Sequence, residues 1–539
     1  MANKKILLIE PGYNNKYPPL GLMKIATYHG PDGKNDNITF IKGEDKSALN
    51  QAWDRIYITT LFSFEWKKIE KTIDFALQVA NDQADRIFVG GIAASLMHKK
   101  FIDESKWSGI RFINGLLNKA PAKSLQLDDF SEEFYSDDIT STPIEQLIPD
   151  YNILEQIEYE YPVRDAYFVY ASRGCVRKCS FCGVPKLEGD FWDTDSITNI
   201  VKGIENKYGA KKDLIFMDNN VVASPRFKDV IAEIRDLGFE KDAKLNRNNR
   251  SIQRRVDFNQ GVDARILCKS KMYLQELSTI CIKPLRIAFD HLGLRKPYET
   301  AVRYAHEFGL DELSNYMLYN FHDSPRDLYE RMLLNVKLNE DLGIRIYSFP
   351  MRYQPTDRPD RGFIGEKWSK YALRSMQVIL QATHGIVSGN PDFFYRAFGE
   401  SAEKFDELLT RPHHFIFNRE WYEKDGGKSE FEDYQIQMKN LSNLEKEELN
   451  LELSKTTAGI FHKLKFSNQK LQRILSYYVP LSDEEEEDIR VQKQKVNKKN
   501  FEEKIYIPDD EKVEDAGYNE ITFTSVPDMG SNSEPTPAI

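Results

Sequence analysis

The sequence has few cysteines, few histidines and no long apolar run, and each shortage narrows what the protein can be. Its 539 residues include only 5 Cys, an odd number, and three of them lie within eight residues, which fits a reduced thiol site better than a disulfide framework. The N-terminal apolar run, Ile6–Ile9, is far too short for a signal sequence or a membrane span. Acidic residues outnumber basic ones by 84 to 74, for a net charge of −10, so no overall basic field draws the protein to nucleic acid or anionic lipid. We therefore expect a cytoplasmic protein without a membrane partner.

The chain has ample apolar material for packed cores. Hydrophobic residues make up 41% and aromatic residues 12% of the sequence, which excludes a mainly disordered protein. A chain of this length also predicts several domains rather than one.

Residues 1–120 alternate short β-rich runs with stretches of helical periodicity, typical of a doubly wound α/β domain with a parallel sheet. Ligands of such domains bind at the carboxyl ends of the strands, where Gly90 and Gly91 fall. The predicted strands are Lys5–Ile9, Ile38–Ile41, Arg55–Thr60, Arg86–Val89 and Ile110–Ile113, and the predicted helices are Leu20–Tyr28 and Trp66–Val79.

Residues 121–165 are acidic and weakly periodic, and we interpret them as a linker. Residues 166–358 then repeat the strand–helix alternation six times, which predicts a partial (β/α)6 barrel with its chemistry at the carboxyl mouth. The six strands are predicted at residues 167–171, 213–218, 256–260, 284–289, 314–320 and 344–349.

The remainder of the chain changes character twice. Residues 359–480 show helical and aromatic patterns, which predict a helical C-terminal region. Residues 481–539 contain an acidic run, a Lys-rich run and a Ser/Pro/Glu-containing end, a composition that favours a disordered tail.

The strongest local signal is a group of three cysteines directly after the first predicted barrel strand. Cys175, Cys179 and Cys182 have the spacing C-x3-C-x2-C. Three thiolates on one loop suit three irons of a 4Fe-4S cluster and leave the fourth iron open for another ligand. A zinc site is the alternative, but it needs a fourth ligand and the nearest histidines are His98 and His291.

This cysteine loop, with an aromatic Phe181 before its last cysteine, resembles that of the radical S-adenosylmethionine enzymes. The resemblance implies that the open iron binds S-adenosylmethionine and that the reduced cluster cleaves it to a 5′-deoxyadenosyl radical, which abstracts hydrogen from a substrate that the sequence does not identify. It also implies a low-potential electron donor such as flavodoxin or ferredoxin. Phe181 and Gly183 are then expected at the cofactor.

The resemblance extends to the ends of later strands. Asp218 and Asn219 end the second strand and are expected to contact cofactor or substrate, unless they only cap the following helix. Asn259, Asp263 and Asp290 follow the third and fourth strands, where the family places contacts to the ribose and carboxylate of S-adenosylmethionine.

Two further residues at the predicted mouth are open to two interpretations. His322 is a candidate substrate contact or a packed, helix-capping residue, and Arg352 is a candidate anion contact or a rim salt bridge.

The N-terminal half adds a second resemblance. The segments Tyr17–Leu22, Val89–Gly91 and Leu147–Tyr151 are similar to those of radical S-adenosylmethionine proteins with an N-terminal cobalamin-binding-like domain. The resemblance admits cobalamin as a further cofactor. The Asp-x-His-x-x-Gly motif that supplies a cobalt-binding histidine in related folds is absent from the sequence.

Two other functions compete with a small-molecule radical enzyme. A cluster of basic residues near the barrel could meet a phosphate backbone, which would suit a nucleic-acid-modifying enzyme, although such a run is also typical of a solvated loop. The other possibility is a non-catalytic iron–sulfur or zinc protein that binds a partner through its helical region. The basic residues are Lys241, Lys244, Arg247, Arg250, Arg254 and Arg255.

Overall fold

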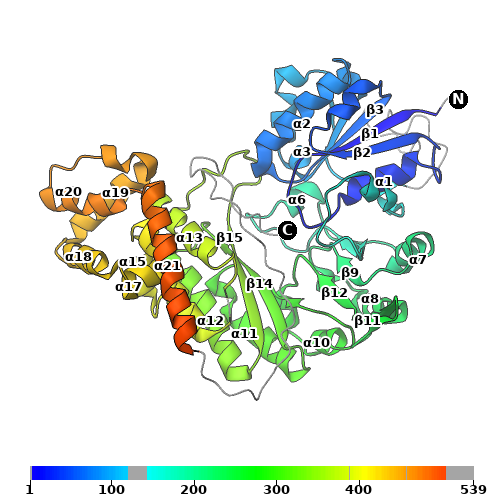
Figure 1. The fold of residues 1–539 in the computed structure, drawn as a ribbon. Helices are drawn as coiled ribbons and strands as arrows, with labels where there is room; N and C mark the ends of the chain where they lie inside the picture. The colour runs from blue at the N-terminus through cyan, green and yellow to red at the C-terminus, as the bar shows by residue number, and fades with distance from the viewer. Residues whose placement is uncertain (1–2, 119–142, 388, 457, 505–539) are drawn as a thin grey trace.

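The computed structural model describes residues 3–118, 143–387, 389–456 and 458–504. Figure 1 shows three parts: the N-terminal sheet in blue at the upper right, the barrel strands in green below it, and the C-terminal helices in yellow and orange at the left. None of the described helices has the length and apolar content that a membrane crossing requires.

The N-terminal part is a doubly wound domain, as the sequence predicts. Its sheet is parallel, in the order β2-β1-β3-β4-β5. Alternate residues of β1 enter different cores: Ile6 packs with helix α1, and Leu7 packs with helix α2 on the opposite face. The strands are β1 (Lys5–Glu10), β2 (Asn37–Lys42), β3 (Arg55–Thr60), β4 (Ile87–Gly91) and β5 (Arg111–Phe112), and the helices are α1 (Leu20–His29), α2 (Trp66–Val79), α3 (Ile92–Leu96) and α4 (His98–Ile102).

The second part is the predicted partial (β/α)6 barrel. Six parallel strands form two three-stranded sheets, β6-β9-β12 and β13-β14-β15. Parallel bridges from Val256 to Ile282 and from Val262 to Ile287 connect the two sheets. The strands are β6 (Ala166–Val169), β9 (Asp213–Phe216), β12 (Arg255–Phe258), β13 (Leu285–Arg286), β14 (Glu312–Tyr319) and β15 (Arg345–Arg352).

Helices alternate with these strands along the chain. They are α7 (Ile197–Tyr208), α8 (Phe227–Ile234), α9 (Ala264–Leu267), α10 (Met272–Leu277), α11 (Arg295–Glu307) and α12 (Pro325–Leu342). The longest, α12, starts with a capping box between Ser324 and Asp327 and ends at Gly343, whose φ of +65° suits glycine.

Two antiparallel hairpins extend the barrel. Strands β7 (Ser172–Arg173) and β8 (Trp192–Asp193) pair around the cysteine loop, which leads into the short helix α6 (Val184–Leu187). Strands β10 (Lys244–Arg247) and β11 (Arg250–Gln253) form the second hairpin just before β12.

The third part is helical. The rings of Phe394 and Phe405 lie 5.5 and 5.6 Å from that of Tyr329 of α12, so the first helices of this region pack on the barrel. The later helices share a separate core. The helices are α13 (Lys370–Ala382), α14 (Pro391–Phe398), α15 (Ala402–Leu409), α16 (His413–Phe417), α17 (Arg419–Lys424), α18 (Lys428–Lys439), α19 (Asn443–Lys455) and α20 (Gln469–Leu475).

One segment differs from the expectation of a disordered tail. Asp483–Lys504 form a further helix, α21, which Figure 1 shows in red-orange beside the other C-terminal helices. Ser482 and Glu485 bond reciprocally at its start, and Ile489 packs on the third core. An S-x-x-E capping pair therefore starts a helix in a segment whose charge composition alone favours disorder. Residues 505–539, and residues 119–142 of the predicted linker, lie outside the described residues.

Candidate functional site

The cysteine loop begins with a backbone conformation that only glycine adopts easily. Gly174 has a φ of +69°, and a Cβ there would overlap the carbonyl of Asp190. The loop then places Cys175, Cys179 and Cys182 between β7 and α6, beyond the carboxyl end of β6. All three thiols are free and half-buried.

The loop directs backbone N–H groups at two of the sulfurs. The N–H of Arg177 lies 3.4 Å from Sγ of Cys175, and that of Val184 lies 3.5 Å from Sγ of Cys182. Burial raises the pKa of Cys182, and the neighbouring Cys179 and Cys175 raise it further, so the three thiols lie within electrostatic range of one another. In the described part of the chain, no three His, Cys, Asp or Glu side chains converge closely enough to hold a single metal ion.

The guanidinium group of Arg265, on the barrel, lies next to the cysteine loop. Asp263, which is 7% exposed, accepts bonds from Nε of Arg177 at 2.8 Å and from Nε of Arg265 at 2.7 Å. Burial alone would raise the pKa of Asp263, but these two arginines hold it below its usual value. Arg265 in turn interacts with Cys179. The predicted Asp263 is therefore at the site, where it orients two guanidinium groups.

Asp290 lies on the same side of the loop. Burial raises the pKa of its carboxyl to about 6, although Arg331 and Arg265 oppose this shift. Burial raises the pKa of Cys179, and the charge of Asp290 raises it further. The structure thus brings the predicted Asp290 into range of the cysteines.

The other predicted residues have different surroundings. Phe181 packs edge-on against Phe321 at 5.8 Å, beyond the end of β14. Gly183 starts α6, and a Cβ there would lie 3.0 Å from Leu96 of the N-terminal domain. Asn259 accepts a 2.7 Å hydrogen bond from the hydroxyl of Tyr17, and its Nδ2 is buried with no partner among the described residues.

The side chains of Asp218 and Asn219 form hydrogen bonds with other residues of the protein. The carboxylate of Asp218 accepts bonds from the backbone of Ala171 and Ser172. Nδ2 of Asn219 donates to Glu188 at 2.9 Å. Neither side chain caps the following helix, which was the alternative from the sequence.

Arg352, Arg247 and Arg254 bond within the fold, whereas the other basic residues of the run, Lys241, Lys244, Arg250 and Arg255, are exposed. Arg352 donates to the carbonyls of Arg361 and Phe363. Arg247 pairs with Asp165 at 2.8 Å, and Arg254, 8% exposed, donates to the Gly238 carbonyl at 2.9 Å. The basic hairpin precedes the amino end of β12, whereas the cysteine loop follows the carboxyl end of β6. This separation disfavours a substrate held jointly by the two.

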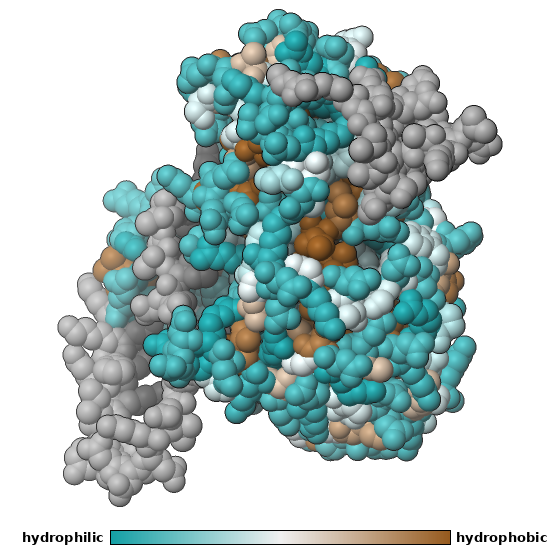
Figure 2. Space-filling model, turned by 90° about the vertical axis from the view of Figure 1, so that its right-hand side faces the viewer, coloured by the Kyte–Doolittle hydropathy of each residue, from teal (hydrophilic) through white to brown (hydrophobic). Residues whose placement is uncertain are grey.

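A cavity of about 270 Å³, which we call the inner cavity, lies between the N-terminal domain and the start of the cysteine loop. Figure 2 shows apolar side chains gathered on one face where the upper part of the molecule meets the body below it. The inner cavity is lined by the carboxyl ends of the N-terminal strands, including Glu10, Thr60, Gly90 and Gly91, and on the barrel side by Tyr170, Arg173, Glu188 and Met217. Among the described residues that line it, none is a histidine.

Charged residues of the inner cavity are absent from the sequence-based prediction. Burial, and secondarily Arg173, lowers the pKa of Lys24 to about 7, and Lys24 donates to the carbonyl of Glu145. Glu10 is 1% exposed and pairs with Lys42. The sequence offered one signal for these residues: Glu10 directly follows a predicted strand, where the ligands of such folds bind.

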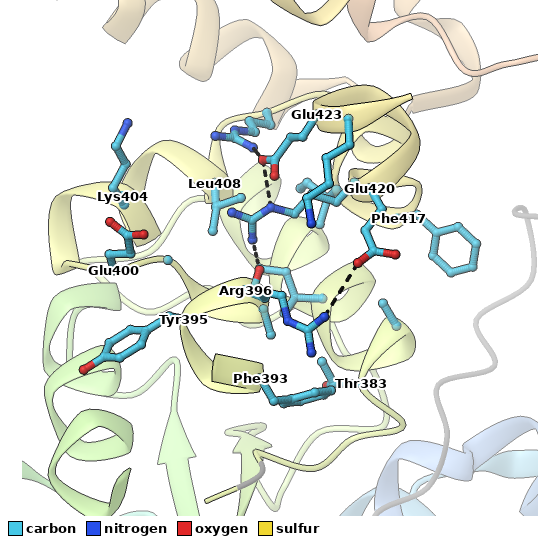
Figure 3. Close-up of a pocket in the computed structure, with 18 of the residues that line it drawn as sticks. Thr383, Phe393, Tyr395, Arg396, Glu400, Lys404, Leu408, Phe417, Glu420 and Glu423 are labelled. Atoms are coloured by element: carbon cyan, nitrogen blue, oxygen red, sulfur yellow. Dashed lines mark hydrogen bonds and ion pairs between the residues drawn. The ribbon is translucent and has the colours of Figure 1, made fainter. Parts of the chain in front are cut away.

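A larger cavity of about 1110 Å³ lies in the helical C-terminal region. Figure 3 shows charged side chains around it, with Arg396 directed at Glu420; these two groups are 3.7 Å apart. Arg411 and Arg419 both pair with Glu423 at 2.9 Å. None of the residues predicted for the site lines this cavity.

Fold and site together define an α/β protein with a helical C-terminal region, whose partial barrel carries a three-cysteine loop next to a doubly wound domain. The sequence matches no protein-family model and no curated protein. Among solved structures, the chain is similar to the radical S-adenosylmethionine methyltransferase TsrM from Kitasatospora setae with cobalamin and a 4Fe-4S cluster bound, at a TM-score of 0.45 and 12% identity over 70% of this chain and 79% of TsrM.

The cobalamin-dependent S-adenosylmethionine radical enzyme OxsB, with aqua-cobalamin and S-adenosylmethionine bound, gives a TM-score of 0.47 at 12% identity over 95% of this chain and 82% of OxsB. Streptococcus suis SuiB bound to S-adenosylmethionine gives a TM-score of 0.27 at 13% identity over 41% of this chain and 48% of SuiB.

Proposed function

We propose that the protein is a radical S-adenosylmethionine enzyme in which Cys175, Cys179 and Cys182 hold a 4Fe-4S cluster. The observation that carries the proposal is the placement of three half-buried thiols on one loop beyond the first strand of a six-stranded parallel barrel. Three protein ligands leave one iron open. The donor set is soft and closely spaced in sequence, and it suits such a cluster.

The bound cluster and S-adenosylmethionine would supply a 5′-deoxyadenosyl radical that abstracts hydrogen from a substrate. The chain's own residues would orient the cofactor. Arg265, held by Asp263, places a positive charge beside Cys179. Asp290 offers a carboxyl with a pKa of about 6, which could accept hydrogen bonds from the amino or ribose hydroxyl groups of S-adenosylmethionine.

The decisive experiment starts with anaerobic reconstitution of the full chain with iron and sulfide. After reduction and addition of S-adenosylmethionine, we expect electron paramagnetic resonance to detect a reduced cluster and chromatography to detect 5′-deoxyadenosine. A chain that takes up no cluster contradicts the proposal. A chain that assembles the cluster but releases no 5′-deoxyadenosine supports the alternative of a non-catalytic iron–sulfur protein.

We propose cobalamin as a second cofactor at the position that the inner cavity marks, although the cavity, at about 270 Å³, holds only part of a corrinoid in this conformation. The cavity lies at the carboxyl edge of a doubly wound sheet, the ligand position of such folds, and Arg173 and Glu188, on either side of the cysteine loop in sequence, are among its lining residues. Its lining lacks histidine, so the chain would bind the corrinoid without an imidazole ligand from the cavity wall. Retention of methylcobalamin through gel filtration tests this. Gly21→Leu should abolish retention, because Gly21 lines the cavity and a Cβ there meets no atom within 4 Å.

The remaining partners follow from this chemistry. A low-potential donor such as flavodoxin or ferredoxin would reduce the cluster in the cytoplasm. The basic hairpin favours a nucleic-acid substrate, but its position at the amino end of β12 makes that alternative the weaker one.

A further inference from the structure

A residue that follows the barrel's second strand forms hydrogen bonds with the segment just before the cysteine loop. Asp218 follows β9 and is 2% exposed. Its carboxylate accepts bonds from the N–H of Ala171 at 3.0 Å, the N–H of Ser172 at 2.5 Å and the hydroxyl of Ser172 at 2.6 Å. A buried carboxylate that accepts three such bonds forms strong, directional contacts.

A second carboxylate holds the next part of the same segment. Glu188, just beyond α6, accepts a bond from the N–H of Gly174 at 2.7 Å and one from the guanidinium of Arg173 at 3.1 Å. Its Oε2 also accepts the 2.9 Å bond from Asn219. Asp218 and its neighbour Asn219 are thus tied to both ends of the segment 171–174.

These contacts fix the peptide units that precede the first thiol. Ala171, Ser172 and Gly174 each give a backbone N–H to one of the two carboxylates. The positive φ of Gly174 then turns the chain into the loop. Because Cys175 directly follows Gly174, the direction of the Cys175 side chain depends on where these carboxylates hold the backbone.

We propose that Asp218 and Glu188 are positioning residues that set the orientation of Cys175 toward the cluster. The inference rests on the proposed function. It assigns Asp218 to the loop rather than to direct contact with cofactor or substrate. Groups that orient metal ligands commonly change metal affinity or activity by roughly 10- to 100-fold when they are replaced.

The test uses three variants and one control in the full-length chain. Asp218→Asn replaces one accepting oxygen by an amide donor that faces the N–H groups of the segment 171–172. Glu188→Gln places an amide donor against the donors of Arg173 and Gly174. Ser172→Ala removes one of the three bonds to Asp218. Asp229→Asn, on the exposed side of α8, is the matched control. Each protein is reconstituted anaerobically, and iron retention against EDTA and the resonance spectrum of the reduced cluster are measured.

We expect Asp218→Asn and Glu188→Gln to lose iron roughly 10- to 100-fold faster than wild type and to show an altered spectrum in the clusters that remain. Ser172→Ala should show a smaller change in the same direction, and Asp229→Asn none. The spectrum distinguishes positioning from a general loss of stability, which would lower the amount of cluster without changing its signature. If a carboxylate variant fails to fold by circular dichroism, Ser172→Ala decides.

Native iron retention and a native spectrum in these variants would overturn the inference and leave the proposed function intact. A wild-type chain that assembles no cluster would instead overturn the proposed function, and this inference with it.

Discussion

The hydroxyl of Tyr17 donates a 2.7 Å hydrogen bond to Oδ1 of Asn259 and thereby joins the N-terminal domain to the barrel. Tyr17 is 7% exposed and Asn259 is 1% exposed, so water does not readily replace the bond. Tyr17 lines the inner cavity, and Asn259 follows β12 at the barrel mouth. This contact is a direct polar connection between the two regions to which we assign cofactors.

Replacement of Tyr17 by Phe should therefore destabilise the protein without removing its ring. Oδ1 of Asn259 would be left buried without a donor, in addition to its already unpartnered Nδ2. We expect the free energy of unfolding to fall by about 1–3 kcal/mol. Urea denaturation measures the change, and Tyr304→Phe on the half-buried side of α11 is the control. Equal stability of the two variants would show that the Tyr17–Asn259 bond contributes little.

The sequence predicts the alternating strands and helices well because their signals are local. The parallel sheets follow from runs of apolar residues such as Leu7 to Ile9 and from the intervening helical periodicity. The contacts that shape the site are not local. Tyr17 and Asn259 are 242 residues apart, and Ser172 and Asp218 are 46 apart, so no short pattern indicates that they meet.

For the same reason, the cysteine loop was predictable and the role of Asp218 was not. The spacing of Cys175, Cys179 and Cys182 is a local signal with few chemical explanations. An acidic residue after a barrel strand suggests a ligand contact, but only the position of the segment before Cys175 shows what its carboxylate binds.

The three thiols should be separable from the other cysteines by iron content. Cys175→Ala or Cys182→Ala removes one of three protein ligands, and we expect either variant to lose most of its reconstituted iron and its absorption near 400 nm. Cys268→Ala, at the half-buried end of α9 outside the loop, should keep both. Iron loss in Cys268→Ala that matches the loop variants would contradict this assignment of ligands.

A buried ion pair inside the barrel should be costly to break from one side. Nε and one terminal nitrogen of Arg286 bond the two carboxylate oxygens of Asp257 at 2.7 and 2.8 Å. Both residues are less than one-tenth exposed. Arg286→Met leaves the carboxylate buried and unpaired, so we expect a loss of about 3–5 kcal/mol in the free energy of unfolding.

The double variant Asp257→Leu/Arg286→Met provides the matched comparison, because it removes both charges. It should be more stable than Arg286→Met alone. Chemical denaturation of Arg286→Met, Asp257→Leu and the double variant decides; a double variant that loses as much as the sum of the two single variants would show that the charges do not interact.

The helical C-terminal region should unfold in acid before other parts of the chain. Burial lowers the pKa of His413 and of His414 to about 4, from an ordinary value of 6.5. As the pH falls below about 6.5, the unfolded chain gains protons that the folded chain does not take up, so stability decreases until about pH 4. The decrease should approach about 1.4 kcal/mol per pH unit for each histidine. Trp421 is buried in this region and is one of six tryptophans, so the difference in fluorescence between the protein and Trp421→Phe should report the transition. The double variant His413→Gln/His414→Gln should flatten the dependence between pH 6 and about 4, and His306→Gln on α11 controls for the loss of a histidine elsewhere. An identical acid transition in all three proteins would show that other groups govern it.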